Sequence, residues 1–346
     1  MKIELAKLKA TAIEILRACG ESCEGAETVA ASMVKADARG ITTHGTHLLV
    51  PVYDRVQAKQ LPLPTAVSLI EEKDATIIVD GGDGLGAIAG KQAVESTAKK
   101  AKQFGVATAL IRNTNNVGSL ACYTEAAAAH GMIAFMCCNA ASAMSPWGGA
   151  EAWMGTNPIA IAIYTGGDIM FSADMASSVV ARGKIRKAAR NGQAIPSNWA
   201  MDADGNITTD PTAALKGCLL PMGGPKGSAL ALAVDIIAGL LSGASYAAGL
   251  KSFHTPCGST GVGAALTVIN IENFMPLDKF TSLIQGYIAN MKALKKAAGQ
   301  TEIFLPGEIE QRQEKKAASE GIDLDAGALE ELKSLLEKIG SKTRLE

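Results

Sequence analysis

Apolar side chains recur every three to four positions at the two ends of the chain. This spacing runs through residues 3–19 and stops at Gly20, and it returns over residues 25–39 and stops at Gly40. A glycine directly after the last periodic position is a common end of a helix. The pattern predicts two amphipathic helices near the N-terminus and a third near the C-terminus, over residues 326–338.

The middle of the chain predicts a sheet. Short apolar runs at residues 75–80, 106–112 and 133–138 alternate with helical segments at 87–104 and 123–129. Strands that alternate with helices in this way are typical of a layered α/β fold. Further strands are predicted at residues 159–164, 169–173 and 266–271, with a basic loop between the second and third of these.

One long apolar run covers residues 227–250. Asp235 lies near its middle, among several glycines and serines. A carboxylate at that depth of a bilayer is unfavourable, so the run predicts a buried core helix instead of a membrane span.

Composition narrows the possible functions. The chain has 346 residues and a formal net charge of −1, with 4% aromatic residues. This length allows two domains. The balanced charge gives no general attraction to nucleic acid or to an anionic membrane. Seven scattered cysteines and the lack of an apolar core in residues 1–10 predict a cytoplasmic protein without disulfides.

A glycine-rich motif suggests one possible nucleotide site. The segment GLGAIA (84–89) lies between a predicted strand and a predicted helix, where a Rossmann fold binds a pyrophosphate. The next strand ends in Arg112 and Asn113, without the acidic residue that holds the adenosine ribose. The alternatives at this point are a Rossmann-type NAD(P) dehydrogenase and a turn that packs a helix closely on a strand.

His44 is the strongest candidate for proton transfer. It follows a predicted helix end in RGITTHG (39–45), beside the hydroxyl of Thr43. Histidine titrates near neutral pH and so serves as a general acid. No histidine has neighbours with the spacing of zinc ligands, so no metal is expected.

Seven ordered motifs resemble the malate/L-lactate dehydrogenase family. They are RGITTHG (39–45), NTNNVG (113–118), PWGG (146–149), GTNP (155–158), DMASSVVARGK (174–184), LPMGGPKGS (220–228) and LPGE (305–308). The resemblance implies an α/β fold outside the Rossmann group, with a mixed sheet, flanking helices and usually a homodimer. It places a helical N-/C-terminal domain at residues 1–72 and 300–346, and a central cofactor-binding α/β domain at residues 73–299.

The resemblance also implies roles for individual residues. His44 would donate the proton, with Thr43 beside it and Asp174 orienting the imidazole. The cofactor, NAD or NADP, would contact three segments of the chain. Their predicted contact residues are Asp168, Asp174, Met175, Ala176, Arg182, Pro225, Lys226, Gly307 and Glu308.

Two substrate positions depart from the family pattern. Leu48 stands where many members carry a carboxylate-binding arginine, and Asn116 stands where they carry a second histidine. His47 is a possible replacement for the missing cation. The sequence therefore predicts an oxidoreductase that transfers hydride between NAD(P)H and a small 2-oxo or 2-hydroxy acid. A catalytically weak nicotinamide-binding protein is the alternative that these two departures leave open.

Overall fold

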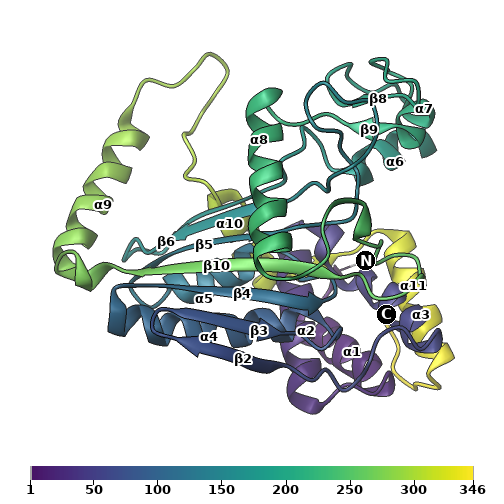
Figure 1. The fold of residues 1–346 in the computed structure, drawn as a ribbon, viewed down its shortest axis with the longest axis horizontal. Coiled ribbons are helices and arrows are strands. Elements are labelled where there is room, and N and C mark those ends of the chain that lie inside the picture. Colours follow the sequence, from purple (N-terminus) through teal and green to yellow (C-terminus); the bar gives the residue numbers. More distant parts are fainter. Residues whose placement is uncertain (1, 346) are drawn as a thin grey trace.

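The computed structural model describes residues 2–345 and is built around a seven-stranded mixed sheet (Figure 1). The strands lie in the order β2-β3-β4-β10-β5-β6-β7. Among them only β3 and β4 run parallel, and every other neighbouring pair is antiparallel. Their bounds are β2 (Ser68–Lys73), β3 (Thr76–Asp80), β4 (Val106–Thr114), β5 (Met132–Cys138), β6 (Ile159–Ile163), β7 (Phe171–Met175) and β10 (Val262–Asn270).

The two ends of the chain fold together beside this sheet. The short strand β1 (Lys2–Ile3) pairs with β11 (Ile322–Asp323), which joins the N-terminal and C-terminal segments. Helices from both ends then pack on one another (Figure 1). These helices are α1 (Leu5–Ala18), α2 (Cys23–Ala38), α3 (Leu49–Gln57), α10 (Glu308–Glu320) and α11 (Ala326–Lys338).

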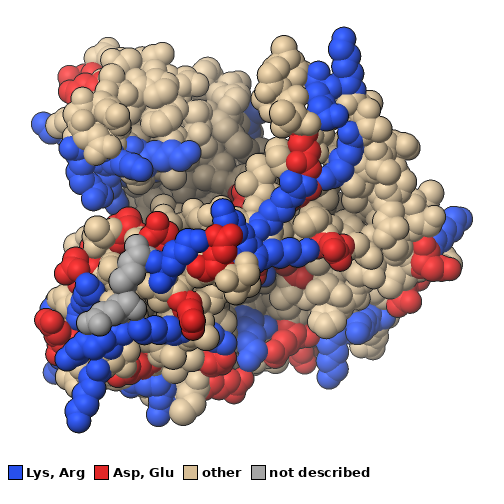
Figure 2. All heavy atoms as spheres, turned by 180° about the vertical axis from the view of Figure 1, so that it is seen from behind, with Lys and Arg blue, Asp and Glu red and all other residues tan. Residues whose placement is uncertain are grey.

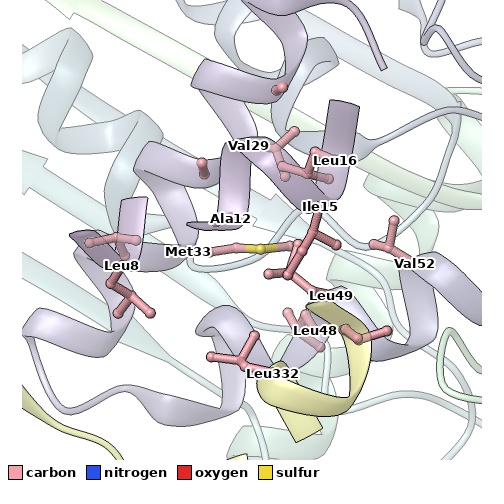
Figure 3. Packing of buried hydrophobic residues seen from close by; sticks show 14 of the residues in the cluster. Leu8, Ala12, Ile15, Leu16, Val29, Met33, Leu48, Leu49, Val52 and Leu332 are labelled. Atoms are coloured by element: carbon pink, nitrogen blue, oxygen red, sulfur yellow. The ribbon is translucent and has the colours of Figure 1, made fainter. Parts of the chain in front are cut away.

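Buried apolar side chains within residues 2–345 form three clusters. The first joins the terminal helices, and Figure 3 shows Leu48 and Leu49 in it together with Leu332 of α11. The second lies between the sheet and the helices α4 (Gly86–Phe104) and α5 (Ala121–Ala128). The third fills a smaller lobe that contains α6 (Arg182–Arg190), β8 (Ala200–Met201), α7 (Pro211–Lys216) and β9 (Cys218–Leu219). The small lobe was not expected, and the domain boundaries at residues 72 and 300 stay a prediction.

The predicted α/β class and mixed sheet are confirmed, but several elements differ. The segment predicted as a basic loop contains α6, of which only Ile185 is buried. Strand β2 was not predicted because all six of its residues are exposed. Helix α9 (Leu277–Ala293) has no buried residue and projects from the body of the molecule (Figure 1). Elements that bury few side chains leave little periodic signal in a sequence.

The prediction of a buried core helix over residues 227–250 is wrong. Helix α8 (Pro225–Val234) passes into a π-helical turn, η3 (Asp235–Leu241), and the chain then leaves the helix. One face of this segment is open, and Leu241 is 66% exposed. Within residues 2–345 no helix is long and apolar enough to cross a membrane.

The Rossmann alternative is also wrong. Strand β4 has a parallel neighbour on one side and the antiparallel β10 on the other, whereas a doubly wound nucleotide fold is mostly parallel. The N-terminus of α4 is covered as well. A Cβ added at Gly86 would lie 2.7 Å from the carbonyl oxygen of Asn116 and 2.8 Å from that of Asn115. The glycines of residues 84–89 therefore allow close packing of backbone on backbone.

Candidate active site

His44 lies on a tight turn that follows α2. Two short 3₁₀ helices, η1 (Thr42–His44) and η2 (Thr46–Leu48), carry the chain from α2 into α3. The buried carboxylate of Asp37 accepts hydrogen bonds from the Thr46 backbone N–H at 2.8 Å and from its hydroxyl at 2.7 Å. A Cβ at Gly45 would lie 1.7 Å from Asp37 Oδ1, so only glycine fits there. Asp37 thus fixes the turn on which His44 sits.

A buried ion pair fixes the end of α2 on the sheet layer. Arg39 Nη1 and Nη2 donate to the two oxygens of Glu125 in α5, at 2.6 and 2.8 Å. Lys35 reaches the same carboxylate at 2.9 Å, and Arg39 Nε donates to Glu314 of α10 at 2.7 Å. Bidentate contacts of this kind set both distance and orientation. The helix that ends six residues before His44 is therefore tied to both α5 and α10.

Three predicted site residues line one narrow pocket. His44, Leu48 and Asn116 face a cavity of about 20 Å³, which is room for roughly one water molecule. Leu48 is 3% exposed and also belongs to the first apolar cluster. The Asn116 side chain accepts a hydrogen bond from the Gly118 backbone N–H at 2.7 Å, so its oxygen shapes its own turn. The remaining lining residues are Val29, Ser32, Met33, Val52, Leu85, Ala87, Val117, Gly118 and Phe253.

The electrostatics of His44 favour a neutral ring that can still accept a proton. Burial lowers the pKa of His44 below its usual value, and the negative charge of Asp174 opposes this shift without cancelling it. Its Nδ1 is buried and has no hydrogen-bond partner within the described chain. A buried nitrogen without a partner is unfavourable by about 1–3 kcal/mol, so it marks a place that a bound group can complete.

Asp174 is anchored from the opposite side of the site. It lies near the end of β7, and its Oδ2 accepts hydrogen bonds from Ser119 Oγ at 2.8 Å and from the Ala121 backbone N–H at 3.0 Å. Ala121 is the first residue of α5, where the helix dipole stabilises a negative charge. The structure thus brings Asp174 and His44 into electrostatic contact, although 130 residues separate them in sequence.

The predicted cofactor segments meet along β7, which is an edge strand of the sheet. At its start, Ser172 N donates to Pro306 O at 2.9 Å, which brings in the segment containing Gly307. Beyond its end, Met222 N donates to Ser177 O at 2.8 Å, and Ser178 forms a bridge with Pro221. Three segments far apart in sequence therefore form one continuous strip, which includes Met175 and Ala176.

The strip fits a dinucleotide phosphate at its far end. Gly223 and Gly224 adopt positive φ angles of 60° and 63°, which turn the chain into α8. Pro225 is the first residue of that helix, and the exposed Lys226 follows it. Free N–H groups at a helix N-terminus together with a lysine suit a pyrophosphate.

Other predicted cofactor residues have partners already. The Glu308 carboxylate accepts hydrogen bonds from Lys292, from Arg312 and from the Leu305 backbone N–H. Asp168 is almost fully exposed and lies 3.8 Å from Lys315. Arg182 donates to the Leu215 carbonyl at 2.7 Å, while Thr43 lies against the start of α6, beside Gly183.

The sequence did not indicate the loop that contributes Phe253 to the lining of the pocket. Arg55 of α3 is completely buried, and its guanidinium donates to the carbonyls of Phe253 at 2.7 Å and Gly258 at 3.0 Å. This contact holds the segment that carries Phe253 and His254. Backbone carbonyls accept these bonds, so no residue pattern in the loop reveals the partnership.

Known proteins share both this fold and this sequence. The family model of malate/L-lactate dehydrogenase matches residues 3–333. L-sulfolactate dehydrogenase of Methanocaldococcus jannaschii is 37% identical, over 95% of this chain and 94% of its own length. Its solved structure superimposes with a TM-score of 0.93 at 36% identity, covering 99% and 98% of the two chains. Malate dehydrogenase of Pyrococcus horikoshii is 34% identical, over 95% of this chain and 92% of its own length.

The fold, the pocket with its histidine and the strip along β7 define a nicotinamide-dependent oxidoreductase outside the Rossmann group. The chain belongs to the malate/L-lactate dehydrogenase family. Other relatives are named for NAD(+), as in ureidoglycolate dehydrogenase of Escherichia coli, and for NADP(+), as in (2R)-3-sulfolactate dehydrogenase of Chromohalobacter salexigens. The cofactor is accordingly NAD or NADP, and the prediction of a dehydrogenase is confirmed over that of a weak binding protein.

Proposed function

We propose that the chain reduces a small 2-oxo acid to the 2-hydroxy acid, and catalyses the reverse oxidation, with His44 as the proton donor. One observation carries the proposal. A half-buried imidazole whose Nδ1 is buried and unpartnered faces a narrow pocket, and the carboxylate whose charge raises its pKa lies on the strand of the predicted cofactor strip. The names of relatives that act on malate, sulfolactate and ureidoglycolate support the same substrate class.

The residues divide the reaction between them. A reduced nicotinamide, when bound, supplies the hydride to the carbonyl carbon. The His44 imidazolium donates its proton to the carbonyl oxygen as that oxygen gains negative charge. Asp174 stabilises the imidazolium before the transfer, and Ser119 with the α5 N-terminus holds Asp174 in place. Lys226 and the Gly223–Gly224 turn would hold the pyrophosphate, with Met175 and Ala176 along the strip between.

A substrate panel tests this proposal. Pyruvate, oxaloacetate, 3-sulfopyruvate and a cyclic imine of a 2-carboxylic acid are each mixed with NADH or NADPH, and the loss of absorbance at the nicotinamide band is followed. We expect at least one 2-oxo acid to be reduced and one of the two cofactors to be preferred. If NADH and NADPH bind but no compound of the panel is reduced, the proposed reaction is wrong.

We further propose that the protein works as a homodimer in the cytoplasm. Apolar side chains are exposed along α8 and η3, among them Leu240 and Leu241, and along α9, where Tyr287 is 70% exposed. Exposed apolar surface of this extent commonly marks a protein interface. Light scattering of the purified protein should give twice the chain mass, and Leu241→Lys should shift the measured mass toward that of the monomer.

The described cysteines are all free, which suits a reducing compartment such as the cytoplasm.

A further inference from the structure

Three of the four histidines of the chain gather beside the pocket. His47 lies in η2, and His254 lies in the loop held by Arg55. Their rings stack with centroids 6.4 Å apart and planes inclined by 22°. Each ring also acts electrostatically with His44. The proton transfer described above uses His44 alone, so this stacked pair has no function in it.

Positive charge surrounds the pair. The positive charges that most lower the pKa of His254 are those of Arg186 in α6 and of Arg55. Arg186 is exposed and forms no ion pair within residues 2–345, and Arg55 bonds only to carbonyls of its loop. The rest of α6 is basic too, with Arg182, Lys184, Lys187 and Arg190 and no acidic residue. In Figure 2 a deep hollow separates the small lobe from the body, and Lys and Arg side chains follow the lobe's edge above it.

Carboxylates do not neutralise this side of the pocket. The negative charge of Asp174 raises the pKa of His44. No acidic group of the described chain has such an effect on the pKa of His254. Asp325 acts on His47, yet its carboxylate caps α11 by accepting a hydrogen bond from the Ala328 backbone N–H at 2.9 Å. The His254 imidazole and the unpaired Arg186 guanidinium are thus left without a negative partner, next to the proposed proton donor, and the carboxylate near His47 is engaged in a helix cap.

We propose that His47, His254 and Arg186 form an anion subsite beside His44, which binds the second anionic group of a dianionic 2-oxo acid. That group is a carboxylate or a sulfonate at the end of the substrate away from the reacting carbonyl. The inference rests on the proposed function. It also accounts for Leu48, because a pocket without a cation at that position must take its charge recognition from neighbouring residues.

Binding of an anion should lead to protonation of His47 and His254. Burial lowers the pKa of His47, and His254 and His44 lower it further, while a hydrogen bond to the Thr42 carbonyl and the charge of Asp325 oppose the shift. Burial, Arg186, Arg55 and His44 lower the pKa of His254. Both rings are therefore neutral at neutral pH in the free protein. An anion bound at the N–H edges of the two rings favours their charged forms, so its binding should take up protons and weaken as the pH rises.

Kinetics on matched substrates test the subsite. The value of kcat/KM is measured for pyruvate, oxaloacetate and 3-sulfopyruvate with wild type, His254→Gln, Arg186→Gln and Lys187→Gln. We expect kcat/KM of wild type to be about tenfold or more higher for a dianion than for pyruvate, because one charged hydrogen bond has an effect of that size. The ratio of kcat/KM for the dianion to kcat/KM for pyruvate should fall about tenfold in His254→Gln and in Arg186→Gln. It should stay unchanged in Lys187→Gln, which removes an adjacent charge that does not act on His254. The two dianions distinguish a carboxylate site from a sulfonate site.

The outcomes separate the two proposals. If no 2-oxo acid is reduced, the proposed function fails. If pyruvate and the dianions are reduced equally well, or if the ratio is the same in His254→Gln as in wild type, only the subsite is wrong.

Calorimetry with malonate gives a readout without turnover. Titration of wild type in two buffers of different ionisation enthalpy should reveal proton uptake, and affinity should fall between pH 6 and 8. Malonate binding without proton uptake, or binding that His254→Gln does not weaken, would overturn the assignment even if a variant were too unstable for kinetics.

Discussion

The two sides of the site are built in different ways. On the His44 side, buried side chains from distant segments fix the geometry: Asp37 holds the turn, and Arg39 with Glu125 ties α2 to α5. On the β7 side, backbone hydrogen bonds join the segments, and the side chains that would face a cofactor are largely exposed, as at Met175 and Lys226.

This difference matches what each side has to do. Proton transfer needs a donor held within hydrogen-bond reach of one atom, and rigid side-chain contacts supply that precision. A dinucleotide is long and carries its own charges, so a strip of backbone with a lysine at one end is enough to bind it. The comparison predicts that changes on the first side alter turnover and stability, whereas changes on the second alter cofactor affinity.

The largest effect should come from His44→Ala. Without the proton donor, the rate of carbonyl reduction should fall by about 10²–10⁴-fold. Steady-state turnover with the best substrate of the panel measures it, and His130→Ala serves as the control, because His130 is exposed and lies outside the pocket. Activity of His44→Ala within a few-fold of wild type would remove His44 from the mechanism.

Glu125→Gln should be the most damaging change to stability. It removes the buried carboxylate that Arg39 binds bidentately and leaves the guanidinium with only the partly exposed Glu314, which lowers the free energy of unfolding by about 3 kcal/mol. Chemical denaturation measures the loss. Glu330→Gln breaks an exposed pair with Lys333 and should change stability by less than about 1 kcal/mol. Equal effects of the two changes would contradict the structural role of the buried pair.

The same pair predicts an acid-sensitive component of stability. Burial raises the pKa of Glu125, but Arg39 and Lys35 outweigh it, and the net pKa is below the usual value of 4.5. A carboxylate with a lowered pKa stabilises the fold above its unfolded-state pKa, and this contribution is lost as the pH falls through the folded-state value. Wild type should lose stability below about pH 4.5 more steeply than Glu125→Gln does.

Leu48→Arg tests the substrate end of the pocket. A guanidinium beside His44 should bind the carboxylate of pyruvate and raise kcat/KM for it by roughly tenfold or more. The pocket lining contains no acid to pair with the new cation, so melting temperature should fall. A natural substrate that presents an apolar group to Leu48 should be reduced more slowly. If every substrate ratio stays the same, position 48 does not contact the substrate.

The pH dependence of reduction should follow His44. Its pKa lies below the usual 6.5 because burial outweighs the charge of Asp174. Reduction needs the protonated ring, so kcat/KM for pyruvate should fall about tenfold per pH unit above that pKa. Oxidation needs the neutral ring and should rise through the same range. Pyruvate is the right substrate here because it carries no second anion for the His47–His254 pair. A flat profile from pH 5 to 8 would contradict the assignment.

The sequence patterns of the β7 side are more local than the contacts of the His44 side. Short motifs such as LPMGGPKGS (220–228) carry the turn, the helix start and the lysine within one continuous segment. The contacts around His44 join residues such as Arg39 and Glu125, which are 86 positions apart. Arg55 adds a second limit, because its acceptors are backbone carbonyls about 200 residues away. Local patterns do not encode such pairings.

The fold shows the same limit. Helix α4 and strands β3 and β4 were predicted because each has a buried face with a regular period. Helix α9 and strand β2 were missed because neither buries a residue in the described chain. The apolar run of α8 and η3 was predicted to be buried because hydrophobicity alone does not distinguish a core segment from an apolar surface.

Cofactor affinity tests the division between the two sides most directly. Fluorescence titration gives the dissociation constants of NADH and NADPH for wild type, His44→Ala, Lys226→Ala and Gly84→Ala. We predict that Lys226→Ala raises the dissociation constant of the preferred dinucleotide by about tenfold, because one charged contact to a phosphate is lost. His44→Ala should stay within about twofold of wild type. Gly84→Ala, whose new Cβ meets Thr65, should lower melting temperature but not affinity. If Lys226→Ala binds normally while His44→Ala or a folded Gly84→Ala loses the dinucleotide, the cofactor does not lie along β7 and the account is wrong.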